Sequence, residues 1–191
     1  MGEGIIKGAE TIQRYIPEAQ AQINTLQERD PIAVGILATA GSVYPIPDVF
    51  TPLILPVRLT DIITYTTFLY SHLRLTHPDT SSRPLLPFPI SPHNSVAAVA
   101  HLVRVTGVKY LWVTEGPMRA VADEIMHQEG LENTVILPFP FFSDLYSESR
   151  SSVPTWKKES NNYVAASLDQ PALILHSSGK LVFIVVSVFL D

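Results

Sequence analysis

The stretch LPFPISPHNSVAAVAHLVRVTGVKYLWV, residues 86–113, places a strand, a helix and a second strand in succession. Its middle part repeats small apolar residues at the spacing of one helix face, at Val96, Val99, Ala100 and Val103. Gly107 follows at a position where glycine commonly ends a helix in left-handed conformation. Tyr110-Leu-Trp-Val113 is a short apolar run, typical of a buried strand. The stretch therefore predicts a βαβ unit with parallel strands.

The same alternation continues on both sides of this unit. We expect further helices over Ala9–Gln27 (divided at Pro17), Asp61–Leu75 and Pro117–Gln128, and further strands over Ile32–Leu37, Thr134–Leu137 and Pro171–His176. Leu86-Pro-Phe-Pro-Ile90 is too rich in proline for a central position in a sheet. The helix after Asp61 is expected to bury the face formed by Ile62, Tyr65, Thr66, Leu69 and Leu73. The predicted fold class is α/β, a mainly parallel sheet flanked by helices.

Composition excludes several classes of protein. The 191 residues are 46% hydrophobic and 16% charged, as in a globular domain with a real core. A formal net charge of -5 leaves no basic footprint for a nucleic acid. The absence of cysteine excludes disulfides and cysteine-bound metals and fits a cytoplasmic protein. The longest apolar stretch, Leu181–Leu190, is about half of the roughly 20 residues that cross a bilayer, so we expect no membrane span.

Two irregular segments interrupt the alternation. Residues 41–59 carry several prolines among apolar residues, between a strand and a helix that normally lie a few residues apart. His77–Leu86 is a shorter interruption, rich in proline and serine. We interpret both as irregular proline-rich insertions, or as ordinary surface loops.

The candidate site is Leu173-Ile-Leu-His-Ser-Ser-Gly179. An apolar strand that runs into hydroxyl residues and a glycine can present backbone N–H groups to phosphate oxygens. Ser177 and Ser178 supply hydroxyl groups, and Gly179 allows a close approach of the backbone. Lys180 adds one positive charge, but the glycine that opens a Walker motif is missing. The alternative is a strand followed by a polar turn without a ligand.

Other candidate sites are weaker. The six histidines are scattered, without the H-E-x-x-H pair of a zinc site, and Ser177 lacks the G-x-S-x-G frame of a hydrolase. Asp123 and Glu124 are expected on a solvated helix face. No metal ligands and no catalytic residues are therefore assigned from the sequence.

Several segments together resemble the acyl-adenylate-forming (AMP-dependent synthetase and ligase) superfamily, which includes acyl-CoA synthetases and the adenylation domains of non-ribosomal peptide synthetases. The likeness is strongest to fungal adenylation domains related to carboxylic-acid reductases. It rests on residues 61–74, on Pro87-Phe-Pro-Ile-Ser-Pro-His-Asn-Ser95 with the helix that follows, and on Pro171-Ala-Leu-Ile-Leu-His-Ser-Ser-Gly179. The last segment resembles the start of the family's phosphate loop. The resemblance implies the N-terminal subdomain of that fold.

The family implies activation of a carboxylic acid by ATP and Mg²⁺ to an acyl-adenylate, followed by transfer to a thiol of CoA or of a carrier protein's phosphopantetheine. Carried over residue by residue, only Ser177, Ser178 and Gly179 fall on the nucleotide-binding motif. His176 is expected to shape the end of the strand. Lys180 departs from the family, which has serine or threonine there. We therefore expect residues 1–179 to be a partial adenylation domain, residues 180–191 to be an apolar tail outside the family, and the isolated chain to be inactive.

One further hypothesis concerns the irregular parts. Codons for Gly179-Lys-Leu can contain a splice-donor sequence, so residues 180–191, and likewise 41–59, could be translated introns.

Two other functions remain open. The alternative function is a non-catalytic α/β module that binds a partner protein and uses the apolar tail as an extra strand. A third hypothesis is a nucleotide-binding module that works by itself.

Overall fold

The computed structural model describes residues 2–19, 30–38, 59–76, 84–146, 171–177 and 180–184. Four parallel strands form one sheet in the order β2-β1-β3-β4. The strands are β1 (Ile32–Leu37), β2 (Leu85–Pro89), β3 (Tyr110–Val113) and β4 (Val135–Pro138). The parallel sheet confirms the predicted α/β class and the βαβ unit.

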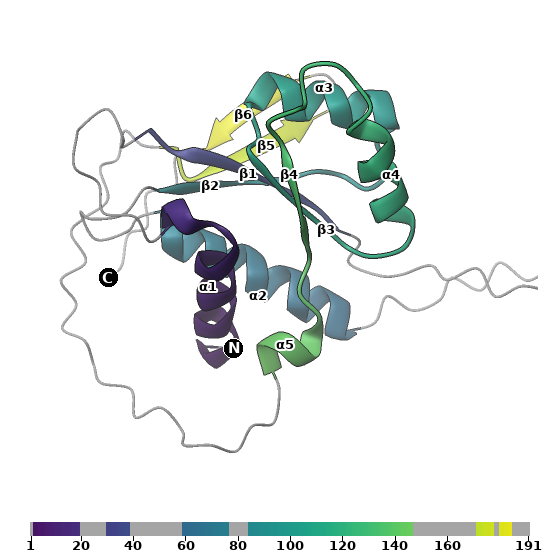
Figure 1. Ribbon diagram of the computed structural model, residues 1–191. Coiled ribbons are helices and arrows are strands. Elements are labelled where there is room, and N and C mark those ends of the chain that lie inside the picture. Colours follow the sequence, from purple (N-terminus) through teal and green to yellow (C-terminus); the bar gives the residue numbers. More distant parts are fainter. Residues whose placement is uncertain are drawn as a thin grey trace, which may run out of the picture.

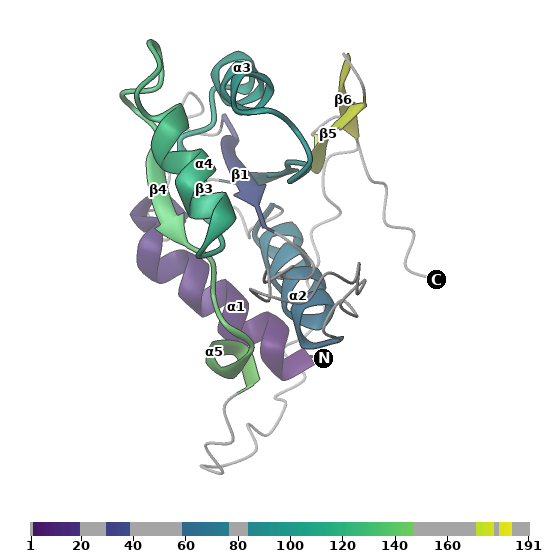
Figure 2. The same ribbon diagram turned by 90° about the vertical axis from the view of Figure 1, so that its right-hand side faces the viewer.

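Helices cover both faces of this sheet (Figures 1 and 2). One face is covered by α1 (Gly2–Tyr15), the short 3₁₀ helix η1 (Pro17–Ala19), α2 (Leu59–Thr76) and α5 (Phe142–Tyr146). The other face is covered by α3 (Val96–Thr106) and α4 (Pro117–Ile125). Alternate residues of each strand serve the two cores: Ile36 of β1 packs with α1 and α2, whereas Leu37 packs with α3 and α4.

Strand β2 lies at one edge of the sheet, which explains its prolines. The backbone N–H of Ile90 donates to the carbonyl of Ile36 in β1 over 2.9 Å, so the even-numbered residues of β2 bond to β1. Pro87 and Pro89 alternate with them, and their nitrogens, which carry no hydrogen, face away from β1. The outer edge of β2 therefore lacks the donors that would pair another strand.

A separate antiparallel hairpin consists of β5 (Leu173–Ser177) and β6 (Lys180–Ile184), in which Ser177 pairs with Lys180. It lies beside β2 (Figure 1). Ile174 of β5 is buried in the core on the α3 side. The hairpin thus packs against the sheet without joining its ladder.

The structure corrects the predicted orientation of α2. Ile62 is 42% exposed, whereas the buried residues are Thr64, Thr67, Phe68, Ser71 and His72. Hydroxyl groups can be buried here because they bond to carbonyls one turn earlier in the helix: Thr64 to Thr60 over 2.7 Å and Ser71 to Thr67 over 2.8 Å. Of the predicted face, Tyr65 and Leu69 do pack against this core, half-buried, so the buried face is rotated from the predicted one and not opposite to it.

Other boundaries differ by a few residues. The first helix begins at Gly2 and ends before Pro17, and α2 begins at Leu59, so Asp61 lies in its first turn and does not cap it. Gly107 ends α3 with φ of 63°, as predicted. The proposed insertion at 41–59 lies outside the described residues except for Leu59. Within the described ranges, no helix has both the length and the apolar character needed to cross a bilayer.

Candidate functional site

The carboxyl ends of β1 and β3 lie side by side where the chain changes direction. From β1 it continues through α2 to β2, and from β3 through α4 to β4 on the other side. The backbone N–H of Thr114, just after β3, donates to the carbonyl of Leu37 at the end of β1 over 3.3 Å. Open α/β sheets bind ligands at this kind of switch point, outside the carboxyl ends of the strands. The carboxyl edge is therefore the candidate site.

Polar groups with unused hydrogen-bonding capacity lie at this edge. The side-chain hydroxyl of Thr114 and the amide nitrogen of Asn94, which follows β2, are buried and have no hydrogen-bond partner among the described residues. Buried polar atoms are usually paired, because an unpaired one costs about 1–3 kcal/mol. Next to Thr114, Glu115 is exposed and Gly116 has φ of 82°, a conformation that favours glycine.

Ser91 organises the turn between β2 and α3. Its carbonyl accepts from the N–H of Asn94 over 3.2 Å, and its hydroxyl accepts from the N–H of His93 over 3.3 Å. Pro92 occupies the second position of this turn, which its fixed φ favours. Ser95 then caps α3: its hydroxyl accepts from the N–H of Ala98 over 3.3 Å. Hydrogen bonds to Ser91 and Ser95 therefore fix the conformation of the turn that leads into α3.

His176 connects the hairpin to this turn. Its Nε2 atom accepts a hydrogen bond from the backbone N–H of Ser91 over 3.2 Å. Its ring also meets the ring of Phe88 edge-on, with centroids 5.8 Å apart. The contact brings the end of β5 to the carboxyl end of β2. It agrees with the expectation that His176 shapes the end of the strand.

The sequence-predicted site residues begin directly after His176. Ser177 is the last residue of β5, so its backbone adjoins the carboxyl edge, while the position of its side chain is not described. Ser178 and Gly179 lie outside the described residues. The prediction that these three residues form a phosphate-binding segment thus remains a prediction.

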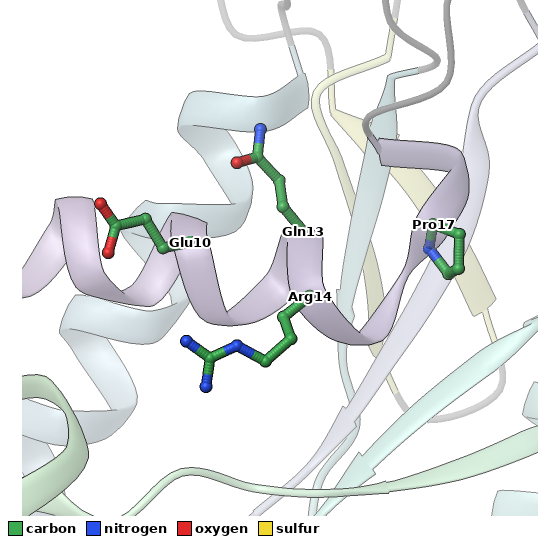
Figure 3. Close-up of a pocket in the computed structure, with 4 residues that line it drawn as sticks. All are labelled: Glu10, Gln13, Arg14 and Pro17. Atoms are coloured by element: carbon green, nitrogen blue, oxygen red, sulfur yellow. The ribbon is translucent and has the colours of Figure 1, made fainter.

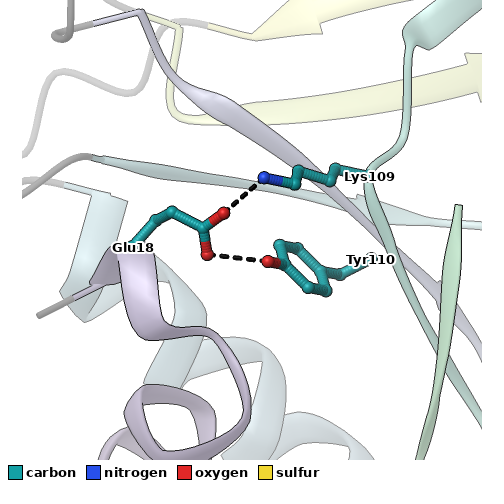
Figure 4. Close-up of polar contacts among 3 residues, drawn as sticks. All are labelled: Glu18, Lys109 and Tyr110. Atoms are coloured by element: carbon teal, nitrogen blue, oxygen red, sulfur yellow. Dashed lines mark hydrogen bonds and ion pairs between the residues drawn. The ribbon is translucent and has the colours of Figure 1, made fainter. Parts of the chain in front are cut away.

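A second polar cluster lies at the opposite, amino-terminal edge of the sheet (Figure 4). Glu18 accepts from the ammonium group of Lys109 and, over 2.7 Å, from the hydroxyl of Tyr110 at the start of β3. Burial acts to raise the pKa of Glu18, but the hydrogen bonds from Lys109 and Tyr110 hold it below its usual value. Burial and the Glu18 carboxylate raise the pKa of Tyr110 to about 12. All three groups are paired with one another, so the cluster joins η1 to β3 and presents no reactive group.

The surface of α1 carries a shallow hollow of about 570 Å³, lined by Glu10, Gln13, Arg14 and Pro17. The side chains of Gln13 and Arg14 extend in opposite directions and do not converge on a common point (Figure 3). The hollow is therefore a poor candidate for a site. Among the described residues, no three His, Cys, Asp or Glu side chains are grouped to hold a metal ion.

Comparison with known proteins supports the fold and the resemblance stated from the sequence. No family model matches the chain. A 101-residue segment, 51% of the chain, is 34% identical to the adenylate-forming reductase Nps10 of Heterobasidion annosum. The fatty acyl CoA synthetase of Mycobacterium tuberculosis superposes with a TM-score of 0.52 and 13% identity over 96% of the chain. The chain thus resembles an adenylate-forming reductase in sequence over about half of its length, and it shares the fold of part of an acyl-CoA synthetase.

The resemblance stated from the sequence is thereby confirmed. The chain covers 9% of the Nps10 reductase and 28% of the synthetase. A further solved structure, apo MbtA of Mycobacterium smegmatis, matches with a TM-score of 0.45 and 18% identity over 88% of the chain and 26% of its own length.

Sequence reasoning did not select Ser91, Asn94 or Thr114. Each comes directly after, or within a short turn after, a predicted strand. Polar residues in that position are a usable signal, since the carboxyl ends of parallel strands share one edge. Near β2 this signal was hard to recognise, because the prolines of residues 86–90 made the end of the strand uncertain.

Proposed function

We propose that this chain supplies the phosphate-binding side of an adenylate-forming site, in which Ser177, Ser178 and Gly179 contact the phosphates of ATP. The observation that carries the proposal is the hydrogen bond from Ser91 to His176, because it sets the end of β5, at Ser177, beside the carboxyl edge of the sheet. The likeness to an adenylate-forming reductase supports ATP as the ligand, and the carboxyl edge is where open α/β sheets bind ligands.

The chemistry of this edge suits a phosphate. Hydroxyl groups and exposed backbone N–H groups donate to phosphate oxygens, and Gly179 leaves the backbone open to them. The amino-terminal end of α3 adds a partial positive charge beside the turn at Ser91. Asn94 and Thr114 contribute side-chain atoms that have no hydrogen-bond partner in the described part of the chain. These groups fit an anionic, hydrogen-bonding ligand.

Bound ATP, with Mg²⁺ as its counter-ion, would supply the adenylyl group that activates a carboxylic acid and releases pyrophosphate. CoA or a carrier-protein phosphopantetheine is the proposed thiol acceptor of the acyl group. The chain covers 28% of the matched synthetase, so we propose that these residues bind nucleotide without completing the reaction by themselves. By the sequence resemblance, Lys180 stands where the family has serine or threonine, so the phosphate loop lacks that hydroxyl group.

A second candidate function is a non-catalytic module that binds a partner protein. It is favoured by one observation: Lys180–Ile184 pairs with β5 along its whole length, so the segment after Gly179 is part of the folded chain. In this second candidate, the β5–β6 hairpin binds the partner protein and no nucleotide is required.

Calorimetric titration with MgATP separates the two candidates. We expect saturable binding to the 191-residue chain, and weaker binding by at least tenfold in Gly179→Val, whose side chain blocks approach to the backbone. Ser143→Ala is the matched control, because Ser143 is exposed on α5, which packs on the opposite face of the sheet. Pyrophosphate exchange with a panel of carboxylic acids then measures whether the chain alone catalyses. Absence of ATP binding, or equal binding by Gly179→Val, would favour the second candidate.

A further inference from the structure

We propose that His176 is a positioning residue, which holds the β5–β6 hairpin at the carboxyl edge of the sheet through the backbone N–H of Ser91. The proposal rests on the proposed function for its consequence, ATP affinity, but the contact itself can be tested without a nucleotide. The proposal follows from Pro87 and Pro89, which remove N–H donors from the outer edge of β2.

The outer edge of β2 offers few main-chain donors. Within β2, every second residue faces away from β1, and two of these positions are Pro87 and Pro89. Neither has an N–H group, so β5 cannot form a regular ladder there. Accordingly β5 packs beside β2 but belongs to a separate sheet. The hairpin therefore needs another means of attachment.

Ser91 carries the next outward-facing N–H group after these prolines. The alternation that turns Ile90 toward β1 turns Ser91 away from it, toward the hairpin. His176 Nε2 accepts this hydrogen bond over 3.2 Å. An acceptor at Nε2 requires that the neutral ring carry its proton on Nδ1. The side chain thus replaces a missing ladder bond.

Two further contacts fix the same geometry. The ring of His176 meets Phe88 edge-on, and Ile174, on the same side of β5, is buried among residues of β2 and α3. Apolar burial attaches the hairpin, but it is not directional. The hydrogen bond from Ser91 sets where β5 ends relative to the turn, and hence where the backbone of Ser177 lies.

The chain offers matched variants for the test. His176→Phe keeps an aromatic ring against Phe88 and removes the acceptor. His176→Gln places a carbonyl oxygen near the position of Nε2, so it should restore the bond. His101→Phe is the control, since His101 is exposed on α3.

Amide hydrogen exchange of Ser91 and the ¹⁵N signals of the His176 ring report directly on the contact. We expect Ser91 to exchange about fivefold faster in His176→Phe, and at the wild-type rate in His176→Gln and in the control. The wild-type ring should show the Nδ1–H tautomer. Unchanged Ser91 exchange in His176→Phe, or the Nε2–H tautomer, would overturn the proposal.

MgATP affinity tests the positioning role. We expect His176→Phe to bind MgATP about fivefold more weakly and His176→Gln to recover the affinity. Faster Ser91 exchange with unchanged ATP affinity would show that the bond has a structural role only, and would overturn the assignment. If the wild-type chain binds no ATP, the proposed function fails, and the exchange and tautomer results still decide whether His176 holds the hairpin.

Discussion

A methyl group added to Gly8 of α1 would lie 2.1 Å from the hydroxyl oxygen of Ser71 in α2. The two helices cross at this point, where the Ser71 hydroxyl also contacts the carbonyl of Ile5 over 3.0 Å. The close approach depends on the absence of a side chain at residue 8. It also explains why α2 presents a small hydroxyl residue to α1 in place of a leucine.

Gly8→Ala should therefore destabilise the protein, although alanine is the better helix former by about 1 kcal/mol. We expect the free energy of unfolding to fall by about 1–3 kcal/mol, as for other overpacked sites. Urea denaturation measures this change. The double variant Gly8→Ala/Ser71→Ala should regain part of the loss, because it removes the clashing oxygen. A stabilised Gly8→Ala protein would contradict the packing of α1 on α2.

The crossing of α1 and α2 shows what the sequence could and could not predict. Continuous apolar strands and the helix at Val96–Val103 were predictable, because burial on both faces leaves a local pattern. The buried face of α2 was predicted only in part, at Tyr65 and Leu69, since Thr67 and Ser71 are buried through hydrogen bonds that a pattern of apolar residues does not reveal. The contact of His176 with Ser91 joins residues 85 positions apart, and no local signal encodes it.

His72 should make the protein sensitive to acid. Its ring is fully buried, and its Nδ1–H donates to the carbonyl of Phe68 over 2.9 Å. Burial lowers the pKa of His72 from 6.5 to about 4, against the smaller opposing effect of the hydrogen bond to Phe68. Between pH 6.5 and about 4, His72 therefore binds a proton in the unfolded chain but not in the folded chain. Stability therefore falls as the pH decreases from 6.5 to about 4, by about 3 kcal/mol in total.

Urea denaturation at pH 7, 6, 5 and 4 tests this dependence. His72→Asn retains a donor for Phe68 but has no titrating group, so its stability should change little between pH 6.5 and 4.5. The exposed His101 provides the control, and His101→Asn should keep the wild-type slope. Below pH 4.5, Glu18 adds a loss in the same direction, because its folded-state pKa is lowered. An equal slope in wild type and His72→Asn would exclude this role for His72.

Glu18 should control the ionisation of Tyr110. Burial raises the pKa of the Tyr110 phenol, and the hydrogen bond to the Glu18 carboxylate, 2.7 Å long, and its charge bring it to about 12. Glu18→Gln removes the charge and keeps a hydrogen-bond acceptor. We expect the pKa of Tyr110 to decrease in this variant and to stay above 10, since burial persists.

NMR titration of ¹³C-labelled tyrosine measures the pKa of Tyr110. Asp123→Asn is the control, because Asp123 is an exposed acid that pairs with Arg119 on α4 over 3.0 Å. An unaltered Tyr110 pKa in Glu18→Gln would show that the carboxylate does not contact the phenol in solution.

The central claim is that the carboxyl edge of the sheet, next to His176, binds the phosphates of ATP. The most direct measurement is an NMR map of the backbone amide signals that shift when MgATP is added to the ¹⁵N-labelled chain. We expect saturable shifts at residues 176–179, in the turn at Ser91–Ser95 and at Thr114–Gly116, with little change around Glu18 and Tyr110. Shifts confined to the amino-terminal edge, or no saturable shift at all, would contradict it.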